Sequence, residues 1–155
     1  MEAPERLLPD DPRLAQVLAL IRESFAYMDG RIDPPSSMHR LTLEGLSNQA
    51  GTAEVWALGH PVAACVVLTP RPDCLYLGKL AVDPRQRGTG LARRLVDLAV
   101  ARARALGLPV LELQVRVELA ENHAAFARLG FARTGETTHA GYDRPTSITM
   151  RRAVA

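Results

Sequence analysis

Two glycines separated by one residue, Gly88 and Gly90, precede an apolar-periodic run that begins at Leu91. Where a strand stops and a helix begins, the first backbone N–H groups of the helix lack partners. Glycine lets the chain adopt positive φ there and lets a ligand approach the backbone closely. The partial positive charge of a helix N-terminus then favours a phosphate group, and Arg85 and Arg87 would add charge at its rim.

Three phosphate-binding patterns can be compared with this stretch. A P-loop places a lysine and a hydroxyl residue after its last glycine, whereas Leu91 follows Gly90 here. A dinucleotide fingerprint needs a third small residue, and that position holds Arg93. The third pattern, [QR]-x-x-G-x-[GA], is matched by Arg85, Gly88 and Gly90.

The rest of the chain must position this loop. Alternating or continuous apolar runs predict strands, and apolar residues at a 3.6-residue period predict helices. We expect strands at Arg6–Pro9, Ala53–Leu58, Val62–Leu68, Cys74–Val82, Pro109–Val117, Phe131–Glu136 and Ser147–Arg152. We expect helices at Pro12–Met28, Met38–Leu46, Leu91–Leu106 and Glu121–Phe131, with Ser36 or Ser37 as the cap of the second. This order predicts a mixed α/β layer rather than a strict βαβ alternation.

Composition narrows the function classes. The chain has 155 residues, enough for one domain, and a formal net charge of +2, which argues against a nucleic-acid partner. No segment approaches the roughly 20 apolar residues of a membrane helix. Cys65 and Cys74 have no metal-ligand spacing, so we expect no metal site, reduced thiols and a cytoplasmic location.

The sequence resembles the GNAT superfamily of N-acetyltransferases, most sharply over Leu77–Val96 and Ala124–Phe131. The order of elements agrees with that family over nearly the whole chain. The resemblance implies a single domain over residues 1–155. It also implies a mixed, mostly antiparallel sheet, splayed between its fourth and fifth strands and flanked by about four helices.

The resemblance also implies acetyl-CoA as the acetyl donor. Its pyrophosphate would be cradled by backbone N–H groups of Arg87, Gly88, Thr89, Gly90, Leu91 and Ala92. Its pantetheine arm would pair with the exposed backbone of Leu80, Ala81 and Val82, and an N–H near Ala81 would polarise the thioester carbonyl. A primary amine would attack directly in a ternary complex, so neither cysteine need be a nucleophile.

The chain departs from the family at its acid and base. Phe126 stands where many members have a tyrosine that protonates the departing thiolate. Leu119 stands where many have an asparagine for the pantetheine, and Asn122 either replaces it or caps a shortened helix. The strand before the glycines lacks the usual glutamate base. Tyr142 and Asp143 are the first candidates for proton transfer, unless the amine arrives neutral or water relays the protons.

The amine acceptor is expected to meet the loop Ser24–Ser37, where Tyr27, Met28 and Arg31 would line one wall and Asp33 would meet a cationic amine. The acceptor itself, a small molecule or a peptide amine, is left open. Two alternatives remain beside a small-molecule N-acetyltransferase: a non-catalytic acetyl-CoA-binding or regulatory domain, and a protein acetyltransferase. A homodimer is compatible with the sequence.

Overall fold

A seven-stranded sheet forms the centre of the computed structural model, which describes residues 3–155. The strands are β1 (Glu5–Leu7), β2 (Glu54–Leu58), β3 (Ala64–Pro70), β4 (Leu75–Val82), β5 (Val110–Arg116), β6 (Ala132–Thr137) and β7 (Ser147–Ala153). Their order across the sheet is β1-β2-β3-β4-β5-β7-β6. Neighbours are antiparallel except for β4 and β5, which are parallel. The expected mixed, mostly antiparallel sheet is confirmed.

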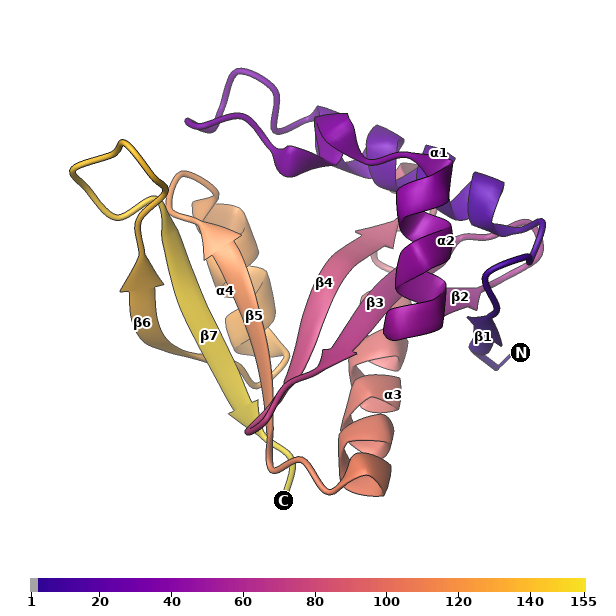
Figure 1. Ribbon diagram of the computed structural model, residues 1–155. Helices are drawn as coiled ribbons and strands as arrows, with labels where there is room; N and C mark the ends of the chain where they lie inside the picture. The colour runs from indigo at the N-terminus through magenta and orange to yellow at the C-terminus, as the bar shows by residue number, and fades with distance from the viewer. Residues whose placement is uncertain (1–2) are drawn as a thin grey trace.

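Helices cover both faces of this sheet (Figure 1). They are α1 (Leu14–Ala26), α2 (Leu43–Thr52), α3 (Leu91–Leu106) and α4 (Ala120–Arg128). Side chains of α1 and α2 pack with Cys65 and Val67 of β3, whereas those of α3 pack with Val66 and Leu68. Because successive strand residues point to opposite faces, the continuous apolar run of β3 serves two cores at once.

The sheet opens between β4 and β5. These strands are in register only at Leu75 with Leu111 and at Tyr76 with Glu112. Beyond that point they diverge, and Figure 1 shows them as the two arms of a V. The predicted splay between the fourth and fifth strands is confirmed.

A β-bulge interrupts β4 near the open end of the V. Cys65 is opposite Ala81 and Val67 is opposite Gly78, so Lys79 and Leu80 together face the one remaining residue of β3. Lys79 has φ 54°, the left-handed region that a side chain rarely adopts. Bulges of this kind re-aim a side chain, often beside an active site.

The second predicted helix, Met38–Leu46, is wrong in its extent. A 3₁₀ turn occupies Ser37–Arg40, with the Ser36 hydroxyl accepting from Met38 N–H. The α-helix begins only at Leu43, where Thr42 accepts from the N–H of Gly45, and it continues to Thr52. Each hydroxyl satisfies an otherwise unpaired N–H, so Ser36 caps the 3₁₀ turn and Thr42 caps the α-helix.

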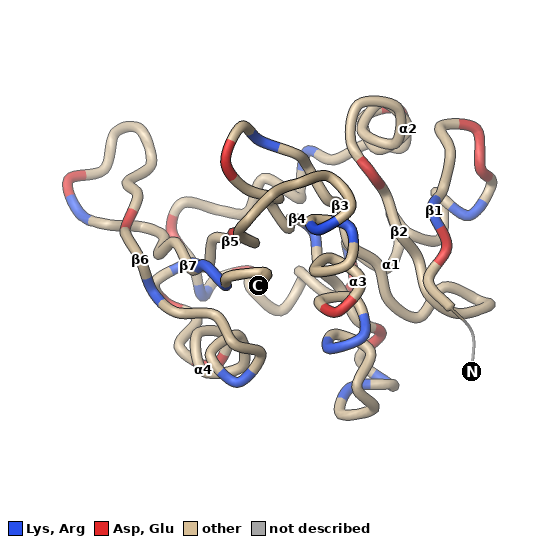
Figure 2. Tube along the Cα trace, turned by 90° about the horizontal axis from the view of Figure 1, so that it is seen from below, with Lys and Arg blue, Asp and Glu red and all other residues tan. Residues whose placement is uncertain are grey.

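Charge is dispersed over the chain. Figure 2 shows basic and acidic positions interspersed over both halves of the sheet. Within residues 3–155, no helix is long and apolar enough to cross a membrane. The same residues hold no group of three His, Cys, Asp or Glu side chains placed to bind a metal ion.

Candidate active site

A cavity of about 940 Å³ lies at the open V, between the diverging strands and the ends of α1, α3 and α4. Most of the residues predicted for the site line it: Tyr27, Met28, Arg31, Leu80, Ala81, Val82, Arg87, Gly88, Gly90, Leu91, Ala92, Asn122 and Phe126. Four predicted residues do not line it: Asp33, Arg85, Thr89 and Tyr142. The fold therefore gathers the expected donor site around one cavity.

The glycine loop meets the geometric needs of a phosphate site. Gly88 and Gly90 have φ values of 81° and 85°, and a Cβ on either would meet no protein atom within 4 Å. Gly90 begins α3 without a side-chain cap, and the first helical hydrogen bond runs from Arg94 N to Gly90 O. The N–H groups of residues 91–93 therefore have no acceptor within the helix. Open space over unpaired N–H groups fits the pyrophosphate of a nucleotide cofactor.

The two arginines of the loop, Arg85 and Arg87, differ in how far their charge is available to a ligand. Arg85 folds back on Asp83, with Nε 2.9 Å from Oδ1, and this ion pair raises the pKa of Arg85. Arg87 lines the cavity, with its guanidinium 5.7 Å from the centre of the Tyr27 ring. Arg87 therefore offers its charge to a ligand, whereas the charge of Arg85 is largely offset.

The backbone of β4 directs different amides to different sides. The N–H of Asp83 donates to the carbonyl of Ala63, the residue before β3, and Ala81 is paired with Cys65 of β3. Because N–H directions alternate along a strand and the bulge lies before Ala81, the amide of Ala81 faces β3 and that of Val82 faces the gap toward β5. The structure thus does not bring the Ala81 N–H to the gap. No pattern in the sequence indicates this bulge, which shifts the register of β4 against β3.

Neither cysteine has the properties of a nucleophile. Burial raises the pKa of Cys65 to about 12 and also raises the pKa of Cys74. Both thiols are buried and free, and neither lines the cavity. Since the thiolate is the reactive form, both side chains are chemically inert at neutral pH.

Two of the residues of α4 that line the cavity, Asn122 and Phe126, were predicted for the site. The Phe126 ring packs edge-on against Phe131, with centroids 6.0 Å apart, and offers no proton. Asn122 Nδ2 donates to Tyr27 Oη over 2.8 Å, while the N-cap of α4 is Leu119. Of the two roles left open for Asn122, the structure excludes the cap.

The segment after α1 is held across the cavity by contacts with the β5–α4 connection. Arg31 Nη2 donates to both carboxylate oxygens of Glu121, at 2.6 and 3.0 Å. Arg116 Nη1 donates to the carbonyl of Pro34 over 2.6 Å. These bonds fix the wall that was expected to meet the acceptor.

Tyr142 and Asp33 bind each other outside the cavity lining. Tyr142 Oη donates to Asp33 Oδ1 over 2.5 Å, and this bond is the main cause of a raised Tyr142 pKa. Arg144 lies 3.8 Å from the second oxygen of Asp33. The structure therefore brings neither the predicted acid–base tyrosine nor the predicted aspartate to the site. Their contact joins segments far apart in sequence, which no local pattern indicates.

One histidine that the sequence reasoning passed over, His139, lines the cavity. The Nδ1 atom of His139 lies 2.5 Å from the hydroxyl of Thr146. Its Nε2 atom, on the far side of the ring, points away from Thr146. Burial, followed by the charge of Arg116, lowers the His139 pKa below its ordinary value. The sequence offered one indication of His139, namely that it lies in the same loop as the candidate Tyr142.

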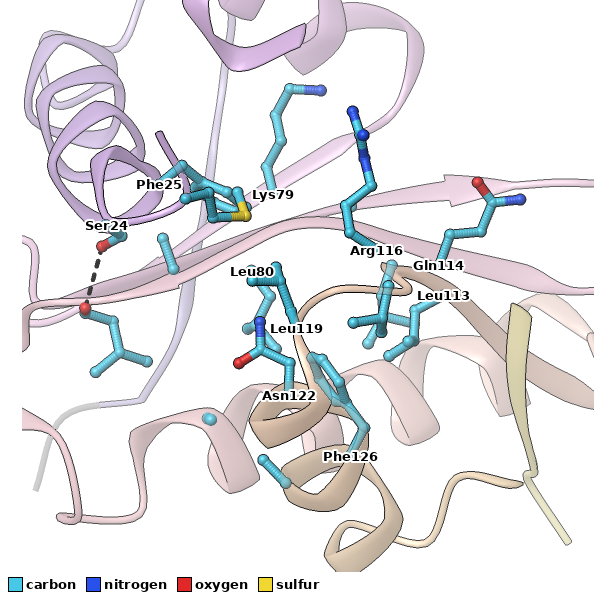
Figure 3. A pocket seen from close by; sticks show the side chains of 18 of the residues that line it. Ser24, Phe25, Lys79, Leu80, Leu113, Gln114, Arg116, Leu119, Asn122 and Phe126 are labelled. Carbon is cyan, nitrogen blue, oxygen red and sulfur yellow. Dashed lines mark hydrogen bonds between the residues drawn. The ribbon is translucent and has the colours of Figure 1, made fainter. Parts of the chain in front are cut away.

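The strands present two different faces to the cavity. Figure 3 shows Lys79, Gln114 and Arg116 pointing to one side. Leu80 and Leu113 lie on the other side of the strands, where Asn122 and Phe126 of α4 also lie. The donor loop lies at the start of α3, so the side with Lys79 is free for a second reactant.

Comparison with known proteins agrees with this geometry. Residues 14–131 match the acetyltransferase (GNAT) family model. The chain is 30% identical over 145 residues to an IAA acetyltransferase of Azospirillum brasilense, covering 92% of this chain and 94% of that protein. The PaiA N-acetyltransferase of Thermoplasma acidophilum, solved with coenzyme A, superposes with a TM-score of 0.80 at 14% identity, over 99% of each chain. An aminoglycoside 6'-N-acetyltransferase, also solved with coenzyme A, gives a TM-score of 0.76 at 14% identity, over 99% of this chain and 98% of that one. The chain belongs to the GNAT family of acetyltransferases.

Proposed function

We propose that the protein transfers the acetyl group of acetyl-CoA to a primary amine by direct attack, with donor and acceptor bound together. Membership of the family makes it an acetyl-CoA-dependent N-acetyltransferase. One observation carries the proposal for this chain: the glycine loop opens directly onto the gap between β4 and β5. A phosphate site beside an unpaired strand edge suits a ligand with a pyrophosphate and an amide-bearing arm.

The residues present fit that donor. The loop at Gly88 and Gly90, with Arg87 beside it, would hold the pyrophosphate. The amide of Val82 faces the gap, where it would donate to the arm or to the thioester oxygen. The donor supplies an activated acetyl group as a thioester. We therefore assign carbonyl polarisation to an amide next to Ala81 rather than to Ala81 itself.

His139 is our candidate for the general base. Its ring lines the cavity, and its lowered pKa leaves it neutral at pH 7, able to accept a proton from an ammonium ion. The bond between Nδ1 and Thr146 orients the ring. Tyr142 and Asp143, the earlier candidates, do not line the cavity.

The departing thiolate has no acid at the position of Phe126, and the inert cysteines argue against an acyl-enzyme. The missing acid also favours a second candidate, a domain that binds acetyl-CoA without turnover. We keep the cytoplasm as the location, since free cysteines suit a reducing compartment.

Calorimetry of acetyl-CoA with the purified protein tests the donor, with NADH and ATP as controls. We expect one-to-one binding of acetyl-CoA and none of the controls. Incubation with an amine panel, followed by mass spectrometry, then separates an enzyme from a binding domain. Binding without acetylation of any amine would favour the second candidate, and the absence of acetyl-CoA binding would overturn both.

A further inference from the structure

The cavity lining is far more basic than the chain as a whole. The chain carries nineteen basic and seventeen acidic residues, which are interspersed (Figure 2). The basic residues that line the cavity are Arg31, Lys79, Arg87, Arg93, Arg116 and Arg128. Within residues 3–155, Glu121 is the one acidic side chain in that lining, and it is bound to Arg31. A polycationic acceptor would enter this cavity against its field.

Some of these cations belong with the donor. Arg87 and Arg93 flank the glycine loop and the first turn of α3, where a pyrophosphate would lie. Lys79 and Arg116 point to the opposite side of the strands, away from Leu80 and Phe126 (Figure 3). Their charges are therefore placed to meet the acceptor.

Lys79 has no counter-ion within the described part of the chain. No hydrogen bond or ion pair of its ammonium group is found among residues 3–155, although the side chain is half-buried in the cavity wall. Burial is the main cause of its lowered pKa. A partly desolvated cation without a partner is costly unless a ligand supplies the opposite charge.

The backbone holds Lys79 in this place at a cost. A left-handed φ of 54° on a side-chain-bearing residue stores strain, and such strain gathers at ligand sites. Without the bulge, position 79 would share a face with Leu75 and Leu77, which pack in the core beside α3. The bulge gives that face to Leu80 and turns the lysine to the acceptor side.

Arg116 forms no salt bridge in the part of the chain that the structure describes, although the charges of Glu118 and Asp33 act on it at longer range. Its guanidinium donates to the carbonyls of Pro34 and Pro35, at 2.6 and 3.2 Å, which do not neutralise its charge. A guanidinium has five N–H donors, so further donors remain for a ligand. Asp33, expected to bind a cationic amine, is instead bound by Tyr142.

We propose that Lys79 and Arg116 form a carboxylate-binding subsite, and that the acceptor is an amine that also carries a carboxylate. This inference rests on the proposed function and names the class of its acceptor. A planar two-oxygen carboxylate suits one ammonium and one guanidinium edge better than a neutral group does. The carboxylate would orient the amine toward the gap between β4 and β5, and it would distinguish such acceptors from polyamines.

Binding to the CoA-saturated protein tests the subsite without turnover. The probes are N-acetyl-L-leucine, N-acetyl-L-methionine and N-acetyl-L-phenylalanine, each paired with its amide, together with spermidine. We expect at least one carboxylate to bind at least tenfold more tightly than its amide. Lys79→Met should reduce that preference to less than threefold, and Lys79→Arg should retain part of it. Arg40→Met, which removes an exposed cation outside the cavity lining, should change nothing.

Three results would overturn the subsite. They are equal binding of carboxylates and amides, tighter binding of spermidine, or no carboxylate binding at millimolar concentration. Each leaves the proposed function standing if CoA itself binds and any amine is acetylated. Loss of CoA binding in the wild-type protein would be a failure of the proposed function instead. A Lys79→Met variant that slows the acetylation of every amine by the same factor would leave the carboxylate preference unchanged. That result would also overturn the subsite.

Discussion

Lys79 and Leu80 point to opposite sides of β4, and the bulge opposite β3 sets which of the two faces the core. Leu80 packs against the core beside α3, and Lys79 lines the side of the cavity that we propose for the acceptor. One backbone irregularity thus decides which of two neighbouring side chains is available to a ligand.

Relieving the strain at this bulge should stabilise the fold. Lys79→Gly removes a left-handed conformation that costs a side-chain-bearing residue about 1 kcal/mol. We expect its free energy of unfolding in urea to rise by about that amount. Lys79→Ala keeps the Cβ and its left-handed φ, so its free energy of unfolding should lie about 1 kcal/mol below that of the glycine variant. Equal stability of the glycine and alanine variants would show that φ at this position carries no strain.

The two ends of α3 offer a matched pair of glycines. Gly90 and Gly107 both have positive φ, and a Cβ on either meets nothing within 4 Å. Replacing either by alanine should lower the free energy of unfolding by about 1 kcal/mol. Only Gly90→Ala should also weaken acetyl-CoA binding, by about tenfold, because its methyl group projects over the phosphate cradle. Calorimetry decides this, and equal affinities for the two variants would place the pyrophosphate elsewhere.

Tyr27 connects three parts of the site. Its ring lies beneath Arg31 and Arg87, at 5.6 and 5.7 Å, and its hydroxyl accepts from Asn122. Tyr27→Ala should raise the Kd for acetyl-CoA about threefold, since a cation–π contact contributes about 0.5–1 kcal/mol at an exposed site. Tyr27→Phe keeps the ring and should raise it less than twofold. A larger loss in the phenylalanine variant would assign the effect to the hydroxyl instead.

The pH dependence of acetyl transfer should report His139. Burial and Arg116 lower its pKa from the ordinary value of 6.5, while Glu118 acts in the opposite direction. A base works in its neutral form, so kcat should fall as the pH drops through a pKa below 6.5, and activity should be full at pH 7. His139→Gln should lower kcat about a hundredfold and abolish this acidic limb.

His123 is the matched control for that measurement. Its Nε2 lies 2.8 Å from the carbonyl of Arg116, and the ring does not line the cavity. His123→Gln should keep the acidic limb. A limb that survives in His139→Gln, or disappears in His123→Gln, would remove His139 from the role of base.

Much of the fold could be predicted because its signals are local. The apolar run of β3 and the period of α3 appear directly in the sequence, and so do the glycines at both ends of α3. The second helix was misplaced because Ser36 and Thr42 are both good caps, and the sequence offers no means of choosing between a 3₁₀ turn and an α-helix. The splay followed from the family resemblance rather than from any residue pattern.

The wall of the cavity that we propose for the donor could also be predicted, since a continuous motif forms it. The wall that we propose for the acceptor could not. The bulge at Lys79 depends on the register between β3 and β4, which no single-strand pattern reports. The bond between Tyr142 and Asp33 joins positions 109 residues apart, so the charge expected to meet an amine is already satisfied. Long-range pairing of polar groups, rather than local propensity, decided which charges face the cavity.

The two halves of the sheet are paired only at Leu75 and Tyr76 of β4. Beyond these residues, the facing edges of β4 and β5 do not bond to each other. A substrate arm seated there would act as the missing strand and complete the folding of the chain. Stability would then rise with the logarithm of substrate concentration. The protein with its donor bound would then resist proteolysis better than the free protein.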